Sequence, residues 1–289
     1  MFSKKEINEY FLNGFIVKSN FINPSIISKF KKEIDSIIGE SSLGNHDKTK
    51  MEMEPNQKIT GRKVRRLYEP CTHYPLFEEY ASSSLVLDHA ECLLGKNIFF
   101  HYSKLNMKAS SVGAVVEWHQ DLAYYPLTNK DSLAILLYID DATKNNGCLK
   151  VIPKYHIKKL LNHTTNGFFQ GMITEKFDTT KAMNLEGKSG TAIFMHCMVP
   201  HASNMNTSNF QRRTLISSYR AADAFPILIN SRESSPEKYA KIVRGDEQMN
   251  ARFTMKSFPI PKYHEDAKSL FSLQDRAKKS LINDKSLLL

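Results

Sequence analysis

The feature that most constrains this fold is a central stretch from Asn97 to about Arg220, in which short apolar segments alternate with turns. The segments are rich in β-branched and aromatic residues and are too short for ordinary helices. The turns between them gather Asn, Gly and Ser, most clearly at 144–147 and 204–209. The expected strands include 98–107, 114–119, 133–139, 148–152, 190–199 and 213–220.

Helical patterns flank this stretch on both sides. Residues 4–12 and 76–94 look helical, and Asn23-Pro24 resembles a helix cap before apolar residues at helical spacing. The tail from about Pro236 is again helix-like and lysine-rich. These patterns predict a mainly β fold with flanking helices, whose core is a jelly roll of the double-stranded β-helix, cupin-like type. We expect a single domain with three parts: helices at 1–96, the jelly roll at about 97–222, and a helical tail at 223–289.

Composition and charge exclude several classes of protein. Apolar residues make up 41% and charged residues 24% of the 289 residues, as in ordinary globular domains. A net charge of +10 is compatible with nucleic acid or an acidic substrate, but no long basic run or zinc-finger spacing is present. We therefore disfavour a nucleic-acid partner. The oligomeric state is not readable from these features.

Cysteine usage and hydropathy bear on the compartment. The four cysteines form no CxxC pair, and the first residues lack the apolar stretch of a signal peptide. No segment approaches the roughly 20 apolar residues that cross a membrane. We expect a cytoplasmic protein without a membrane partner.

The segment Trp118-His119-Gln120-Asp121 is the first sign of chemistry. In an extended strand, side chains at i and i+2 point to the same side, so His119 and Asp121 can address one point in space. A neutral imidazole and a carboxylate suit Fe(II), and a third ligand would complete a facial triad with open coordination positions. An HxD pair often arises by chance, however, and a structural role is the commoner interpretation of any single histidine.

His201 is the best candidate for the third ligand. It closes the expected strand 190–200 and precedes a polar turn, so its ring can lie at the mouth of a barrel. His196 is the alternative. Strand alternation places His196 on the opposite face from His201, unless Pro200 or a bulge intervenes.

Arg212 makes a metal site with 2-oxoglutarate more specific. It lies at the start of the next expected strand, where a guanidinium can hold a carboxylate through two parallel hydrogen bonds. 2-Oxoglutarate chelates iron through its 1-carboxylate and 2-keto groups, and its distal carboxylate needs such a partner. Ser203 is placed to donate to the same carboxylate. Arg213 is the alternative, but alternation turns it to the other face of the strand.

At these residues the chain resembles the phytanoyl-CoA dioxygenase family of Fe(II)- and 2-oxoglutarate-dependent oxygenases. The resemblance covers roughly residues 98–222 and depends on three segments in the same order, followed by Arg212. These segments are 118–126, 145–153 and 201–206. The first and last are also similar to the ectoine hydroxylases.

The resemblance implies Fe(II) ligands at His119, Asp121 and His201, with 2-oxoglutarate and O2 as co-substrates. It implies hydroxylation of an aliphatic C–H bond of a small molecule, with release of succinate and CO2. Halogenating relatives have a small residue in place of the carboxylate ligand. Because Asp121 is present here, hydroxylation is the favoured outcome.

The resemblance also implies where 2-oxoglutarate binds. Arg212 would form the salt bridge to it, assisted by Ser203. Asn106 matches a polar strand position that touches 2-oxoglutarate in relatives. Tyr102 would share its strand face and join it, although ordinary barrel lining is an equally good interpretation of Tyr102 and Lys104.

The motif does not specify the substrate. Candidate substrate contacts near the ligands are Tyr124, Tyr125 and Arg220. We expect the polar stretch from about Ser41 to Arg66 to be a long loop. Its segment from Arg62 to Arg66 would close over the mouth, where Arg65 and Arg66 would bind a carboxylate or phosphate; plain surface charge is the alternative interpretation. An anionic or amino-acid-like small molecule fits these residues.

A cupin-like metal-binding or sensor protein without turnover is the alternative function. It would need the three metal ligands but no arginine for 2-oxoglutarate. Arg212 and Ser203 therefore argue against it.

Overall fold

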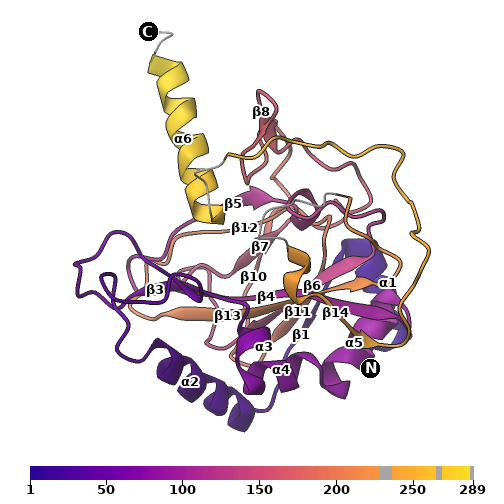
Figure 1. Cartoon of the computed structure of the whole chain (residues 1–289), viewed down its shortest axis with the longest axis horizontal. Helices are drawn as coiled ribbons and strands as arrows, with labels where there is room; N and C mark the ends of the chain where they lie inside the picture. The colour runs from indigo at the N-terminus through magenta and orange to yellow at the C-terminus, as the bar shows by residue number, and fades with distance from the viewer. Residues whose placement is uncertain (228–235, 265–268, 287–289) are drawn as a thin grey trace.

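The computed structural model describes residues 1–227, 236–264 and 269–286, and it shows two β-sheets with helices on the outer side of the larger one (Figure 1). The larger sheet has the strand order β1-β11-β6-β13-β4-β3-β2, and β14 also pairs with β4. The smaller sheet has the order β10-β7-β12-β5, and β8 and β9 form a separate pair. The predicted jelly-roll core is thereby confirmed.

The strands of the larger sheet are β1 (Phe15–Lys18), β2 (Met51–Met53), β3 (Val64–Tyr68), β4 (Ile98–Lys108), β6 (Ser132–Tyr138), β11 (Ala192–His196), β13 (Arg212–Ala221) and β14 (Lys241–Arg244). The remaining strands are β5 (Val116–His119), β7 (Leu149–Val151), β8 (Thr164–Thr165), β9 (Phe168–Phe169), β10 (Met183–Leu185) and β12 (His201–Ser203). The helices are α1 (Lys4–Asn13), α2 (Pro24–Ile38), α3 (Pro70–His73), α4 (Pro75–Ala81), α5 (Ser84–Leu94), α6 (Leu270–Ser286) and the 3-10 helices η1 (Asp121–Ala123) and η2 (Pro236–Tyr239).

Strand β6 shows why the sequence makes a two-layer core. All its residues are buried, because one face meets the helices and the other meets the smaller sheet. Leu133, Ile135 and Leu137 belong to the core beneath the helices. Leu136 and Tyr138 belong to the core between the sheets. An apolar run with no polar alternation is what a strand buried on both faces requires.

The N-terminal helices form where the sequence predicts them. Asn23 caps α2 by accepting the Ser25 backbone N–H, with Pro24 at the first helical position. The apolar stripe of α2 buries Ile27 and Phe30 against the sheet core. Helices α2 to α5 thus cover the outer face of the larger sheet (Figure 1).

The prediction of a long loop over 41–66 is wrong in its second half. Strands β2 and β3 form a hairpin there, and β3 continues the larger sheet by pairing with β4. Arg65 and Arg66 lie in β3 and are buried. The charged residues made this strand look like a solvent-exposed loop. In the structure the aliphatic parts of the two arginine side chains pack in the interior, and their guanidinium groups bond to polar side chains there.

The predicted helical tail is also only partly right. After the segment 222–227, the described residues form η2 and then β14, which pairs with β4. Helix α6 follows an extended segment and projects from the body with the C-terminus (Figure 1). Among the described residues of the tail, α6 alone is an α-helix.

Candidate active site

His119, Asp121 and His201 converge at one end of the jelly roll. Asp121 Oδ1 lies 3.9 Å from His119 Nε2 and 3.7 Å from His201 Nε2. The three potential ligand atoms all lie within 4.8 Å of one another, and all three residues are buried. This geometry suits one divalent ion bound by two imidazoles and one carboxylate.

The two histidines meet because of strand register. β12 pairs antiparallel with β5 in the smaller sheet, and His201 is directly opposite His119. Their ring centroids are 4.0 Å apart. Residues directly opposite each other in an antiparallel pair have side chains this close, so the strand pairing alone explains the contact.

Backbone hydrogen bonds orient both rings. His119 Nδ1 lies 2.8 Å from the Glu117 carbonyl oxygen, and His201 Nδ1 lies 3.0 Å from that of Val199. A carbonyl can only accept, so each Nδ1 carries the proton and each Nε2 presents a lone pair to the shared point. Burial lowers the pKa of both histidines, and for His119 the neighbouring His201 lowers it further. Neutral imidazoles are the form that binds a metal.

Gln120 fixes the loop that carries Asp121. Its fully buried side chain donates to the Met198 carbonyl at 2.8 Å and accepts the Leu161 N–H at 2.8 Å. Met198 lies in the turn just before His201. One glutamine therefore links the segment of Asp121 to the segment of His201.

The structure corrects two details of the predicted triad. His201 does not close the preceding strand: β11 ends at His196, and His201 begins β12 in the other sheet. Asp121 does not lie in the strand of His119: β5 ends at His119, Gln120 is still extended, and Asp121 begins the 3-10 helix η1. The rival His196 lies away from the triad, with its ring 5.3 Å from that of His156.

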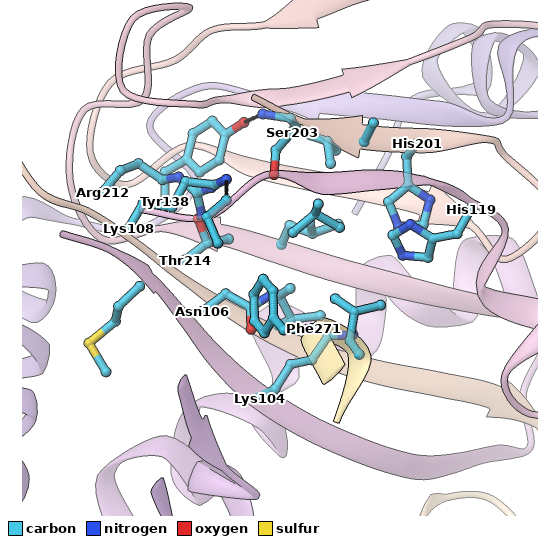
Figure 2. Close-up of a pocket in the computed structure, with 18 residues that line it drawn as sticks. Lys104, Asn106, Lys108, His119, Tyr138, His201, Ser203, Arg212, Thr214 and Phe271 are labelled. Carbon is cyan, nitrogen blue, oxygen red and sulfur yellow. Dashed lines mark hydrogen bonds between the residues drawn. The ribbon is translucent and has the colours of Figure 1, made fainter. Parts of the chain in front are cut away.

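A cavity extends from the two histidines to Arg212 and lies between the two sheets (Figure 2). Ser203 and Asn106 line it, as the sequence predicts for the 2-oxoglutarate site. Arg212 donates from Nη1 to Thr214 Oγ1 and from Nη2 to the Gly147 carbonyl, each at 2.8 Å.

The charge of Arg212 lacks a counterion. The side chain is buried, its Nε has no hydrogen-bond partner, and within the described ranges no carboxylate forms an ion pair with it. Burial lowers the pKa of Arg212, although an arginine stays charged. A buried, unpaired guanidinium costs several kcal/mol in general, on the order of 3–5. A carboxylate ligand in the cavity would remove this cost, so the residues present fit 2-oxoglutarate.

Sequence reasoning missed three further polar residues of this cavity: Lys108, Tyr138 and Thr214 (Figure 2). Lys108 donates to the carbonyls of Ala114 and Asn204. Alternation along β4 could have indicated Lys108, since it shares a face with Asn106. Tyr138 and Thr214 required the pairing of β6 with β13, which no local pattern predicts.

The structure distributes the remaining predicted residues differently. Tyr102 does not line the cavity but packs with its ring 5.4 Å from Tyr125. Tyr124 lies closer to the metal site, with its ring 5.4 Å from His119 and its hydroxyl bonded to the Gly171 carbonyl. Tyr125 is buried in the same aromatic cluster as Tyr102.

The predicted arginines separate into three environments. Arg220 lies on the strand face of Arg212 but farther along β13, with its guanidinium 4.6 Å from the Phe99 ring centroid. Arg65 forms a buried ion pair with Glu54 at 2.8 Å. Arg66 approaches the cavity, because its Nε donates to Asn106 Oδ1 at 3.0 Å.

Helix α6 covers part of the cavity that the predicted loop was expected to close. Leu270 and Phe271 line the cavity, and Phe271 is buried. Gln274 anchors the helix by donating to the Gly171 carbonyl at 2.7 Å and by accepting the Glu117 N–H at 3.0 Å. The sequence pattern at 270–286 predicts a helix but does not predict where that helix packs, so its position at the cavity could not be foreseen.

A jelly roll with a His-x-Asp…His cluster at one end and a buried arginine in the same cavity defines the class of Fe(II)- and 2-oxoglutarate-dependent oxygenases. The model of one family, phytanoyl-CoA dioxygenase (PhyH), matches residues 10–214. The chain belongs to this family. The predicted class of enzyme, a dioxygenase that uses Fe(II) and 2-oxoglutarate and acts on a small molecule, is thereby confirmed.

Two curated relatives are similar over most of the chain. A probable alpha-ketoglutarate-dependent hypophosphite dioxygenase from Stutzerimonas stutzeri is 31% identical over 236 residues, or 79% of this chain and 82% of the relative. The peroxisomal phytanoyl-CoA dioxygenase of Homo sapiens is 27% identical over 252 residues, or 81% of this chain and 72% of the relative.

Solved structures share the fold. EctD from S. alaskensis, in a crystal structure with bound Fe, superposes with a TM-score of 0.64 at 22% identity. The match covers 76% of this chain and 77% of EctD. Among the residues that the structure describes, no helix is long and apolar enough to cross a membrane.

Proposed function

We propose that this protein is an Fe(II)- and 2-oxoglutarate-dependent hydroxylase in which His119, Asp121 and His201 hold the metal. Support comes from their convergence with neutral Nε2 atoms facing one point. When bound, the iron supplies O2 activation coupled to decarboxylation of the 2-oxoglutarate co-substrate. The protein supplies three ligands, a dry cavity and a fixed position for the substrate.

Arg212, with Ser203 and Asn106, would hold 2-oxoglutarate in the cavity. The observation that carries this proposal is the buried Arg212 guanidinium, which has no counterion of its own and lies in the cavity of the two histidines. A sensor protein would have no use for an uncompensated charge at this place. The alternative of a non-catalytic metal-binding protein is therefore disfavoured.

The proposed reaction is hydroxylation of an aliphatic C–H bond of a small molecule, with release of succinate and CO2. The relative named for hypophosphite favours a second candidate, oxygen transfer to a small phosphorus oxyanion. An anionic substrate suits the basic walls of the cavity, described below. An amino-acid-like substrate is supported by the similar L-proline trans-4-hydroxylase of Streptomyces griseoviridis.

We also propose that the chain works as one domain. Strand β1 near the N-terminus pairs with β11 in the larger sheet. At the other end of the chain, Phe271 of α6 lies 4.3 Å from the Arg65 guanidinium of β3. Both termini of the described structure thus contribute to one set of packed layers.

The experiment is an anaerobic titration of the apoprotein with Fe(II) and 2-oxoglutarate, followed by succinate measurement in air. A visible absorbance band on adding 2-oxoglutarate and slow succinate release without substrate are expected. Asp121→Ala and His201→Ala should lose both. Lys154→Ala, a surface variant, should keep them. Full succinate release by the Asp121 variant, without an added ligand, would contradict the proposed metal site.

A further inference from the structure

Lys104 points from β4 into the cavity on the side of the metal ligands (Figure 2). It is half-buried, and it lines the same cavity as His119 and His201. Its Nζ lies 3.5 Å from the Tyr102 hydroxyl and 5.2 Å from the Tyr102 ring centroid. It has no carboxylate partner at ion-pair distance in the described parts of the chain.

Arg66 is a second cation beside Lys104. It lies in β3 opposite Asn106 of β4, and its Nε donates to Asn106 Oδ1. The side chain is 7% exposed, yet its Nη2 is buried without a hydrogen-bond partner. Its guanidinium carbon lies 5.1 Å from the centroid of Phe271, which closes the cavity from α6. A buried N–H group without an acceptor in the protein is available to an acceptor atom of a bound ligand.

Among the described residues no carboxylate forms an ion pair with either cation; Glu52, opposite Arg66 in β2, instead lies 3.7 Å from Arg65 Nη1. Glu69 accepts the backbone N–H of Ser103 at 2.9 Å, and its own pKa is raised to about 7 by burial. Asp121 belongs to the metal site. Burial lowers the pKa of Lys104 to about 8, so the side chain still carries its charge at neutral pH. Two like charges inside the protein are unfavourable unless an anion lies between them.

2-Oxoglutarate alone does not account for both groups of cations. Its distal carboxylate is assigned to Arg212, at the end of the cavity where Lys108 also lies. Lys104 lies apart from Arg212 in the cavity (Figure 2), and the guanidinium of Arg66 lies against the Phe271 ring of α6. A second anion would therefore bind beside the metal while 2-oxoglutarate is present.

We propose that Lys104 and Arg66 form an anion-binding subsite next to the metal, which holds a compact oxyanion group of the substrate, either a phosphorus oxyanion or a carboxylate. This inference rests on the proposed function. The ring of Tyr124 lies 5.4 Å from that of His119, and Phe271 lines the cavity from α6. The subsite thus selects a small anion and places its reactive bond close to the metal ligands.

The test uses the full chain loaded with Fe(II) and 2-oxoglutarate. Succinate release is measured with hypophosphite, phosphite, methylphosphonate and acetate, and with acetamide as an uncharged probe. We expect at least one anion, but not acetamide, to raise succinate release above the rate without substrate. The phosphorus and carboxylate arms distinguish the two sources of the oxyanion.

Variants of the two cations then separate the substrate from the co-substrate. Lys104→Met and Arg66→Gln should raise the KM for the active anion roughly tenfold to a hundredfold, the effect of one charge-assisted hydrogen bond. In Lys104→Met the KM for 2-oxoglutarate should change less than about twofold, since that co-substrate has its own cation. Arg66→Gln also removes the donor to Asn106, so its KM for 2-oxoglutarate should change by less than its KM for the anion. Lys104→Arg should restore most of the anion affinity, because it restores the charge.

Three results would overturn the subsite. One is that no anion of the panel raises succinate release or the Tm of the loaded wild-type protein. A second is an unchanged KM for the anion in both variants. A third is a rise in the KM for 2-oxoglutarate equal to that for the anion, which would assign the two cations to the co-substrate. Absence of the 2-oxoglutarate absorbance band in the wild-type protein would instead count against the proposed function itself.

Discussion

Replacement of Arg212 by methionine tests the proposed 2-oxoglutarate site most directly. Methionine keeps a long apolar stem in the buried position but removes the guanidinium. The Nε of Arg212 has no partner, while its two Nη groups each make one hydrogen bond, to Thr214 and to the Gly147 carbonyl. Donor N–H groups therefore remain for a bidentate contact with a carboxylate.

The expected loss of co-substrate affinity follows from that contact. Two charge-assisted hydrogen bonds at about 1.5–3 kcal/mol each amount to about 3–6 kcal/mol. Each 1.4 kcal/mol corresponds to a factor of ten, so Arg212→Met should weaken 2-oxoglutarate binding roughly 100-fold to 20,000-fold. Removing the donors to Thr214 and Gly147 also destabilises the fold. The assay therefore compares the affinities of two co-substrates within the same protein, so that a general loss of stability affects both equally.

The assay measures the affinity for 2-oxoglutarate and for 2-oxopentanoate, which lacks the distal carboxylate. In the wild-type protein 2-oxoglutarate should bind far more tightly, and in Arg212→Met the two should become nearly equal. Arg213→Met is the matched control, because the Arg213 side chain is ion-paired with Asp140 on the opposite face. It should keep the preference for 2-oxoglutarate. An unchanged preference in Arg212→Met would refute this reasoning.

Three further perturbations have defined outcomes. Gly147→Ala places a Cβ against the Asn204 carbonyl at a φ of +80°, so it should lower the free energy of unfolding by about 1–3 kcal/mol and lower the Tm accordingly. It should also weaken 2-oxoglutarate binding, because the Gly147 carbonyl accepts a hydrogen bond from Arg212. No change in either the Tm or the affinity would contradict this prediction. Gln120→Leu removes the hydrogen bond that links the segment of Asp121 to the segment of His201. It should weaken Fe(II) binding about tenfold to a hundredfold, as measured by metal titration. An unchanged affinity would show that Gln120 has no positioning role. The pKa of Asp140 is held below its usual value, since the hydrogen bonds and charge of Arg213 outweigh the effect of burial. The ionised form is thus stabilised by folding: the contribution is present above the unfolded pKa and is lost as the pH falls through the lowered one. Asp140→Asn should therefore destabilise the protein in urea at pH 7 and progressively less as the pH is lowered below the ordinary pKa of a carboxyl group, and an equal effect at every pH would exclude this linkage.

Several elements were readable from local sequence because their causes are local. Helix α2 begins where Asn23 caps it, and β6 is a strand because a short apolar run between turns can be little else. His119 and Asp121 were predicted as a pair by their spacing, and they do converge. Local patterns failed at 41–66, where the residues that pack β3 against its neighbours carry charges that look solvent-exposed in the sequence.

The sequence by itself determined which chemical groups the chain carries and in what order, since those are properties of side-chain type and short-range spacing. The tertiary structure decided which of those groups meet. His201 faces His119 because β12 lies beside β5, and Lys104 faces the site with Arg66 because β3 pairs with β4. Such pairings depend on how distant segments bury their apolar faces together, and no window of the sequence contains that information.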